Sequence, residues 1–286
     1  MKRRWLSTVL VGIALIGVGC KPPDPAGAPS GTAAAPAPAA SGYPSSMAAL
    51  GDSITLAFGA CLAPAACPRN SWATGNGTRI NSHYKRIVSA NPAMREHAHN
   101  FASGKATVDA LAGQAASAGR AKVDYVTILI GANDACHGDI AAMTSVAAFR
   151  QRLDRALDVL ARDLPDARVL VISIPNVYRL WEIGHTNRLA VKVWSFGVCP
   201  ALLANPTSTA PADTARRAAF RDRIAAYNAQ LVAACATHRA QCRDDGGAAH
   251  RTAFALDMLN VEDFFHPNTK GQNTLARVTY PGRFDW

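Results

Sequence analysis

The stretch VDYVTILIGAND, residues 123–134, decides the fold. Its first eight residues are almost all β-branched or aliphatic. A short apolar run of this kind is typical of a strand that is buried on both faces of a parallel sheet. The run ends at Gly131, which opens the turn Gly-Ala-Asn-Asp. A second run of the same kind, RVLVISI over residues 168–174, is closed by Pro175.

The segment between these two strands predicts an amphipathic helix over Thr144–Arg162. Its large apolar residues share one helical face: Val146, Phe149, Leu153, Leu157 and Leu160. A strand, a helix and a second buried strand in this order form the unit from which parallel sheets are built. We therefore expect an α/β domain with a central parallel sheet.

The rest of the chain continues this alternation. Shorter strands are expected at Met47–Leu50, His97–Ala102 and Phe254–Met258. Helices are expected in the second half of Asn70–Ala90 and over Ala106–Gly119, Ala212–Thr237 and Asn268–Val278. In a parallel α/β sheet, ligands bind beyond the carboxyl ends of the strands. The polar or small residues just after the expected strands are Ser53, Gly104, Asn133 and Asn176.

The N-terminal segment is typical of a bacterial export signal. Basic residues after Met1 precede an apolar stretch, Trp5–Gly19, that is shorter than the about 20 residues needed to span a bilayer. Cys20 follows directly, as at a lipoprotein cleavage site. We predict that residues 1–20 are a lipoprotein-type signal peptide and that a lipidated Cys20 anchors the protein to a membrane of the bacterial cell envelope. The alternative is an ordinary secretory peptide that releases a secreted protein, because Gly17 stands where lipoprotein signals usually have a large aliphatic residue.

Residues 21–45 consist mainly of Pro, Ala, Gly and Ser. Such a segment buries too little apolar surface to offset its chain entropy, so we predict a disordered tether. The remaining residues, 46–286, are enough for one large domain and contain no internal linker. We expect this domain to act as a monomer.

The composition is globular and basic, with 49% hydrophobic and 17% charged residues and a formal net charge of +10. Its arginines are scattered along the expected helices, which favours a solvated surface. A nucleic-acid-binding face would need a recognition fold or aromatic residues interleaved with the basic ones, and the sequence has neither. We therefore expect no nucleic-acid partner, although weak attraction to an anionic membrane or cell wall is compatible with this charge.

The cysteine count supports export. Setting Cys20 aside leaves six cysteines, an even number that predicts disulfides in an exported domain. Six cysteines allow 15 pairings, and sequence alone does not choose among them. Proximity along the chain favours two pairs and leaves a third. The expected pairs are Cys61–Cys67, Cys235–Cys242 and Cys136–Cys199.

Several of the residues after the strands suit acyl transfer, which needs a nucleophile, a base, a group that orients the base, and donors for the oxyanion. Ser53 follows the first strand and is the candidate nucleophile. Near the C-terminus, Asp263 and His266 are three residues apart, so that the carboxylate would accept a hydrogen bond from the imidazole. Gly104 lets a backbone N–H approach a substrate closely, and Asn133 offers a side-chain donor. Each motif alone is common, and only their combination indicates an esterase.

Taken together, these motifs resemble those of the SGNH, or GDSL-type, hydrolases over residues 47–280. The sequence departs in one letter of the first block, where Ile54 replaces the usual Leu. The matching blocks are Gly51-Asp52-Ser53-Ile54, Ser103-Gly104, Gly131-Ala132-Asn133-Asp134 and Asp263-Phe264-Phe265-His266-Pro267.

This resemblance implies a flavodoxin-like three-layer α/β/α fold and catalysis without a metal or cofactor. It implies that Ser53 is the nucleophile and His266 its base. It also implies that the backbone N–H groups of Ser53 and Gly104 and the side chain of Asn133 bind the oxyanion.

The sequence therefore predicts an exported serine esterase or lipase that cleaves carboxylic esters through an acyl-serine intermediate. An alternative within the same reaction class is an O-acetyl esterase acting on cell-wall or plant polysaccharide. A non-enzymatic surface-binding lipoprotein is a further alternative. The aromatic-rich stretch 176–208 is either a packed excursion that covers a sheet edge or a wall of the acyl-binding cleft.

Overall fold

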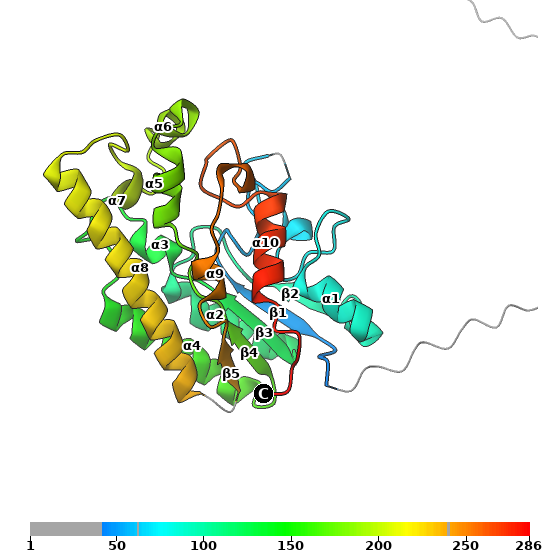
Figure 1. Ribbon diagram of the computed structural model, residues 1–286. Helices are drawn as coiled ribbons and strands as arrows, with labels where there is room; N and C mark the ends of the chain where they lie inside the picture. The colour runs from blue at the N-terminus through cyan, green and yellow to red at the C-terminus, as the bar shows by residue number, and fades with distance from the viewer. Residues whose placement is uncertain (1–41, 62, 239–240) are drawn as a thin grey trace, which may run out of the picture. The chain divides into compact units, whose positions relative to one another are not determined.

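The computed structural model describes residues 42–61, 63–238 and 241–286. The predicted signal peptide, Cys20 and nearly all of the predicted tether lie outside these residues. The described part is built on a parallel five-stranded sheet with the order β2-β1-β3-β4-β5 (Figure 1). The strands are β1 (Met47–Gly51), β2 (Ala98–Asn100), β3 (Tyr125–Leu129), β4 (Arg168–Val171) and β5 (Cys242–Asp244).

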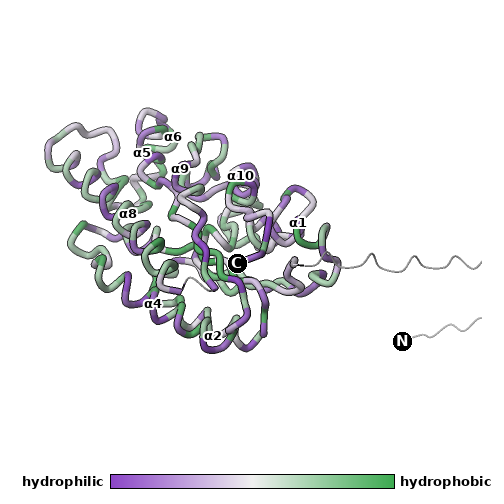
Figure 2. Tube along the Cα trace, turned by 60° about the horizontal axis from the view of Figure 1, so that its bottom comes forward, coloured by the Kyte–Doolittle hydropathy of each residue, from purple (hydrophilic) through white to green (hydrophobic). Residues whose placement is uncertain are grey.

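Helices cover both faces of the sheet, which gives the three-layer α/β/α architecture that the sequence predicted (Figure 1). On one face, α4 (Val146–Asp163) packs between α2 (Leu111–Ala121) and α8 (Pro211–Thr237). The opposite face carries α1 (His83–Ala90) and α10 (Thr269–Thr279). Hydrophobic and hydrophilic residues alternate along these helices, as expected for elements with one face in the core (Figure 2).

Local sequence fixes where several of these elements begin and end. The side chains of Ser82, Ser145 and Asn268 accept hydrogen bonds from backbone N–H groups in the first turns of α1, α4 and α10. Every residue of β1 and β3 is buried, in line with their apolar sequences. No helix in the described ranges is both long enough and apolar enough to cross a membrane.

One strand differs from the prediction. Residues Phe254–Met258 are not a strand: they include a 3₁₀ turn over Leu256–Met258. The fifth strand is instead Cys242–Asp244, which pairs with β4 at the sheet edge. This strand is three residues long and carries an exposed Arg243, so it lacks the apolar run that signals a buried strand.

The stretch after β4 forms a helical excursion made of α5 (Tyr178–Gly184), α6 (Arg188–Trp194) and α7 (Pro200–Leu203). A disulfide between Cys136 and Cys199 ties it to the segment that follows the short helix α3 (Ala132–Ala135). The other two disulfides, Cys61–Cys67 and Cys235–Cys242, also join the expected partners. The remaining short helix is α9 (Ala248–Arg251), and 3₁₀ turns occupy Pro68–Asn70, Pro92–Met94 and Val108–Ala110.

Candidate active site

Ser53 lies two residues beyond Gly51, the last residue of β1, and the turn between them requires glycine at position 51. Gly51 has φ +148°, and a Cβ on it would come within 2.2 Å of the Leu129 carbonyl oxygen in the neighbouring strand. The Gln114 side chain holds this glycine from both sides: its Oε1 accepts from Gly51 N–H at 2.7 Å and its Nε2 donates to Gly51 O at 2.9 Å. The position of the Ser53 hydroxyl is therefore set by buried backbone contacts.

The strand order places this turn at the point where the sheet topology reverses. β1 pairs with β2 on one side and with β3 on the other, and ligands in open α/β sheets bind beyond the carboxyl ends of the strands at such a switch point. The segments after β1, β2 and β3 are joined there by hydrogen bonds. Ser103 N–H donates to Gly51 O at 3.1 Å, and Asn133 Nδ2 donates to Ala106 O at 2.9 Å.

The loop between η4 (Leu256–Met258) and α10 brings Asp263 and His266 together. One carboxylate oxygen of Asp263 accepts from the backbone N–H groups of Phe265 and His266 at 2.9 and 3.0 Å. Its other oxygen lies 2.7 Å from His266 Nδ1. The loop is closed by a hydrogen bond from Asn260 N–H to His266 O at 2.8 Å. The ring of His266 is thereby fixed through both its backbone and its Nδ1.

Ser53 and His266 meet across the top of the sheet although 213 residues separate them. The Ser53 Oγ lies 2.8 Å from His266 Nε2. Because the Asp263 carboxylate accepts from Nδ1–H, the neutral imidazole carries its free lone pair on Nε2, which can accept the Ser53 proton. Ser53, His266 and Asp263 thus form a continuous hydrogen-bonded chain, and Ser53 is only 8% exposed.

The three expected oxyanion donors have capacity to bind an anion. Among the described residues, the Ser53 and Gly104 N–H groups donate to no backbone carbonyl. The side-chain NH₂ of Asn133 has two N–H groups, and one of them donates to Ala106 O, which fixes the orientation of the side chain. A Cβ added to Gly104 would meet no protein atom within 4 Å, so packing alone does not require glycine at this position.

Two buried carboxyl groups adjoin candidate site residues in the sequence: Asp52 precedes Ser53, and Asp134 follows Asn133. Burial raises the pKa of Asp52 to about 7, although its hydrogen bond from Ile54 N–H and the nearby His266 act in the opposite direction. Burial also raises the pKa of Asp134, which accepts from Val108 N–H at 2.9 Å. Asp52 Oδ2 has no hydrogen-bond partner in the described part of the chain. Burial without a partner for this oxygen makes the carboxyl group harder to ionise than it is in water.

Other residues that support the site were not predicted from the sequence. The fully buried Gln272 of α10 donates to Ile54 O at 2.9 Å and accepts from Trp72 N–H at 2.9 Å. The ring of Phe58 packs on that of His266 with a centroid distance of 4.8 Å. Gln114 and Gln272 each stand on an otherwise apolar helix face, which is the signal that could have pointed to a buried polar contact.

An apolar cavity adjoins the candidate triad. It is narrow, with a volume of about 30 Å³. Its lining includes the neighbours of three candidate site residues: Ile54 beside Ser53, Ala132 beside Asn133, and Pro267 beside His266. The start of the excursion contributes Asn176, Val177 and Leu180 to the lining. One end of the excursion therefore lines a cavity at the site.

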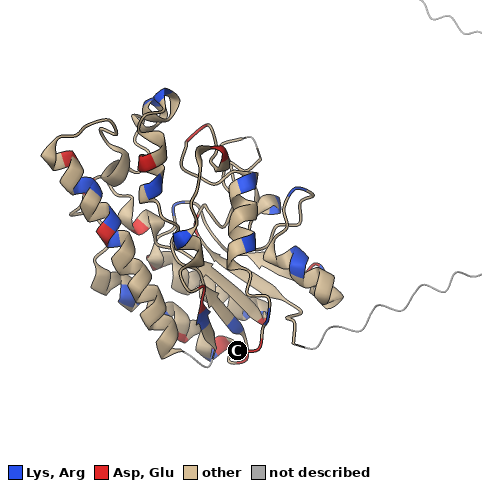
Figure 3. Ribbon diagram, viewed as in Figure 1, with Lys and Arg blue, Asp and Glu red and all other residues tan. Residues whose placement is uncertain are grey.

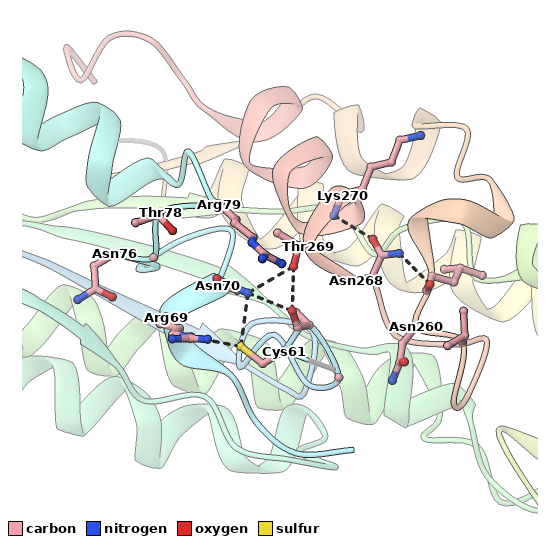
Figure 4. A pocket seen from close by; sticks show the side chains of 15 residues that line it. Cys61, Arg69, Asn70, Asn76, Thr78, Arg79, Asn260, Asn268, Thr269 and Lys270 are labelled. Carbon is pink, nitrogen blue, oxygen red and sulfur yellow. Dashed lines mark hydrogen bonds between the residues drawn. The ribbon is translucent and has the colours of Figure 1, made fainter. Parts of the chain in front are cut away.

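A larger and more polar hollow of about 810 Å³ lies on another side of the same loop. Its side chains include Arg69, Asn70, Arg79 and Thr269, and Asn70 Nδ2 donates to the Ala60 carbonyl and to Thr269 (Figure 4). Leu259 lines both this hollow and the narrow cavity. The loop that carries His266 thus has an apolar cavity on one side and a polar hollow on the other.

Within the described ranges, no three His, Cys, Asp or Glu side chains are grouped so that they could hold a metal ion. The side chains on hand at the candidate site are those of serine-based acyl transfer.

Comparison with models of protein families identifies the family of this chain. The model of the GDSL-like Lipase/Acylhydrolase family matches residues 49–273. The chain belongs to this family. Membership of this family implies that the protein is an ester hydrolase. Among curated proteins, none matches the chain closely enough to be counted as a relative.

Solved structures show the same fold. A protein from Parabacteroides merdae described as a GDSL-like lipase has a TM-score of 0.52 and 15% identity, and the match covers 84% of this chain and 96% of that one. An acetyl-xylooligosaccharide esterase from Geobacillus has a TM-score of 0.50 and 13% identity, with 87% and 96% covered. At these identities the likeness establishes the α/β/α fold of the GDSL-like family and not a substrate.

Proposed function

We propose that this GDSL-like protein hydrolyses carboxylic esters with Ser53 as nucleophile, His266 as general base and Asp263 as the residue that orients the base. The observation that carries the proposal is the continuous contact from Asp263 Oδ2 to His266 Nδ1 at 2.7 Å and from His266 Nε2 to Ser53 Oγ at 2.8 Å. These distances are those required for proton transfer in a nucleophile–base pair.

The reaction proceeds in two steps. In the first, Ser53 Oγ attacks the ester carbonyl while His266 Nε2 takes the hydroxyl proton and then returns it to the leaving alcohol. In the second, His266 takes a proton from water while the water oxygen attacks the acyl-serine carbonyl; the bond to Ser53 Oγ then breaks, His266 returns the proton to Ser53 Oγ, and the carboxylic acid is released. Asp263 stabilises the imidazolium that forms in each step. The N–H groups of Ser53 and Gly104 and the Asn133 amide stabilise the tetrahedral oxyanion.

The narrow apolar cavity supports binding of the acyl group rather than the alcohol. Its lining is apolar except for Asn176 and includes Ile54, Leu180 and Phe265, which suits a hydrocarbon chain. Its volume of about 30 Å³ favours short acyl groups, because a cavity needs about 10–15 Å³ for a single water molecule.

A second candidate within this chemistry is an O-acetyl esterase for polysaccharides. It is favoured by the same narrowness, which an acetyl group would fill, and by the amide, hydroxyl and guanidinium groups of the polar hollow, which suit a sugar. Rates on a series of p-nitrophenyl esters from acetyl to decanoyl, beside acetylated xylan and peptidoglycan, distinguish the two candidates. Higher rates on the soluble esters, with a maximum at a short chain, support the esterase or lipase, and preference for acetylated polysaccharide supports the alternative.

Two variants test the catalytic assignment itself. Ser53→Ala and His266→Ala should each lower the turnover of p-nitrophenyl butyrate by several orders of magnitude, because such residues act as a unit. Ser89→Ala, which changes an exposed serine on α1, is the matched control and should leave turnover unchanged. Labelling of the wild type, but not of Ser53→Ala, by a fluorophosphonate probe would identify the nucleophile. Full activity in either catalytic variant would remove the proposal. A wild type that neither turns over the ester nor reacts with the probe would favour a non-enzymatic binding protein.

We further propose that the protein is exported and anchored through a lipid on Cys20. Three disulfides in the domain support an oxidising compartment. The test is metabolic labelling with a clickable fatty acid in a bacterial host, comparing wild type with Cys20→Ser. Label in the wild type alone supports the anchor. Equal label, or none in either protein, favours the ordinary secretory peptide.

A further inference from the structure

The outer tip of the excursion presents large apolar side chains to solvent. Phe196 is 81% exposed and Leu189 is 54% exposed, although most side chains of this size in the domain are buried. Of the four large hydrophobic residues that are exposed in the described ranges, these two and Val261 belong to the excursion and to the loop that carries His266. Only Val232, on α8, lies elsewhere.

This exposure is not the result of a loosely packed helix. The inner side of α6 is anchored by Ala190 and Trp194, which are 0% and 1% exposed. Trp194 packs so closely on α5 that a Cβ at Gly184 would approach its ring to 2.2 Å. The Asn187 side chain caps α6 by accepting from the N–H groups of Leu189 and Ala190. The tip is therefore a fixed surface, which we define as Arg188, Leu189, Lys192 and Phe196.

The charge at this tip has one sign. Arg188 and Lys192 are both exposed, and the sequence contains no Asp or Glu between Glu182 and Asp213. Figure 3 shows α6 with basic residues and no acidic ones, at the end of the molecule away from the chain's C-terminus. Exposed aromatic and aliphatic side chains interleaved with cations suit an anionic lipid surface, where the rings enter the interface and the cations meet phosphate groups.

The tip is also placed to make such contact useful. At the start of the excursion, Asn176, Val177 and Leu180 line the apolar cavity that Ile54, the neighbour of Ser53, also lines. The Cys136–Cys199 disulfide ties the excursion to the segment after Asn133. α6 projects beyond α5 at the end of the domain where the strands terminate (Figure 1). A surface bound to the tip would therefore lie on the same side of the molecule as the site.

We propose that the tip formed by Arg188, Leu189, Lys192 and Phe196 docks the domain onto anionic lipid surfaces. The docking depends only on the residues of the tip. Its purpose, to present ester lipids to Ser53, rests on the proposed function.

The test is co-sedimentation of the full-length protein with vesicles of phosphatidylcholine containing phosphatidylglycerol, compared with phosphatidylcholine alone. Phe196→Ser should weaken partitioning about tenfold, from the hydrophobic contribution of one aromatic side chain. Arg188→Gln and Lys192→Gln should each weaken it about fivefold on the anionic vesicles only. The matched control is Val232→Ser, which removes an aliphatic residue of α8 that is 48% exposed and should change nothing. All the proteins compared, the reference included, carry Cys20→Ser, so that a lipid on this residue does not add binding to both vesicle types.

Hydrolysis of soluble p-nitrophenyl butyrate separates this inference from the catalytic one. The tip variants should keep full activity on this ester, which also shows that they fold. If the wild type lacks esterase activity but the tip variants still lose vesicle binding, the proposed function fails and the docking surface stands. If the tip variants bind vesicles as the wild type and the control do, or bind both vesicle types equally, the proposal is overturned. A concentration-dependent dimer that Phe196→Ser abolishes, without a change in vesicle binding, would identify a second copy as the occupant and overturn it as well.

Discussion

At the scale of single residues, Gly104 is a position where the fold tolerates a side chain but the proposed oxyanion site does not. A Cβ at this position would enter open space, and its φ is not in the left-handed region. Gly104→Ala should therefore leave the fold intact, and it should raise stability by about 0.4–1 kcal/mol by restricting the unfolded chain. Turnover of p-nitrophenyl butyrate should nevertheless fall about 10- to 100-fold, less than for complete loss of an oxyanion donor.

Gly113→Ala is the control for that experiment. Gly113 is an exposed residue of α2 whose added Cβ would likewise meet no atom within 4 Å. It should gain about 1 kcal/mol of stability, measured by urea unfolding, with unchanged turnover. Equal turnover in both variants would show that no substrate atom approaches Gly104.

Asp52 makes a second prediction at this scale, concerning the dependence of stability on pH. Burial penalises the charged form and so raises the pKa of this carboxyl group from an ordinary 3.8 to about 7 in the fold. Between these values the unfolded chain is ionised while the folded chain keeps its proton, so the contribution of Asp52 to stability is lost as pH rises towards 7. Asp52→Asn remains neutral and keeps the oxygen that accepts from Ile54 N–H. The variant should gain stability over the wild type as pH rises from about 4 to 8, by at most about 4 kcal/mol.

Urea unfolding of both proteins at pH 4 and pH 8 measures this difference. Asp166→Asn, at an exposed carboxylate, is the control and should show no such trend. A stability difference between Asp52→Asn and wild type that is the same at both pH values would mean that Asp52 is ionised in the fold.

At the scale of secondary-structure elements, the Cys136–Cys199 bridge joins the excursion to the end of α3. It closes a long loop, with a sequence separation of 63, whereas that of Cys235–Cys242 is 7. On the chain-entropy model, the double variant Cys136→Ala/Cys199→Ala should lose about 4 kcal/mol and Cys235→Ala/Cys242→Ala about 2 kcal/mol. Only the first should also raise KM, because its bridge holds the excursion that lines the apolar cavity. A normal KM in the first variant, under conditions where it is folded, would dissociate the excursion from substrate binding.

The strands and helices could be predicted from sequence where their residues are apolar in a regular pattern. Tyr125–Leu129 is such a strand, and its pattern is independent of what lies around it. Cys242–Asp244 is a strand only because it pairs with the edge of β4, so its own residues carried no signal. Phe254–Met258 has the alternation of a strand but pairs with none of the five strands, and its last three residues turn as a 3₁₀ helix.

The candidate site was predictable for the opposite reason. Ser53, Asn133 and the Asp263–His266 pair each lie in a short contiguous block. The parallel strands β1 and β3 bring the first two blocks to one edge, and the loop between η4 and α10 carries the third. The residues that hold these blocks in place could not be found in this way. Gln114 bonds a backbone group 63 residues away, and Gln272 bonds one 218 residues away. A single glutamine on an apolar helix face predicts a buried polar contact but does not identify its partner.

At the scale of the whole molecule, Gln272 links the last helix to the turn after the first strand. It accepts from Trp72 N–H and donates to Ile54 O, and it is completely buried. Gln272→Ala would leave two buried backbone groups without partners, at a cost of about 1–3 kcal/mol each. It should lower both the urea midpoint and kcat, because the Ser53 turn loses a support. Gln230→Ala, on α8, serves as the control. If Gln272→Ala is destabilised but retains full kcat, the contact supports the fold and not the nucleophile.

The two ends of the described chain also lie together. The Tyr43 hydroxyl donates to Gly282 O at 3.2 Å, and the Tyr43 and Phe284 rings are 5.5 Å apart. Tyr43 precedes the start of β1, and the C-terminus lies at the end of the sheet where the strands begin (Figure 1). Ser53 follows the other, carboxyl end of β1. Fusion partners or immobilisation linkers attached at residue 286 should therefore leave substrate access unobstructed. A short peptide joining residue 286 to residue 42 should give a cyclic template for permutation, with new ends opened at exposed loops.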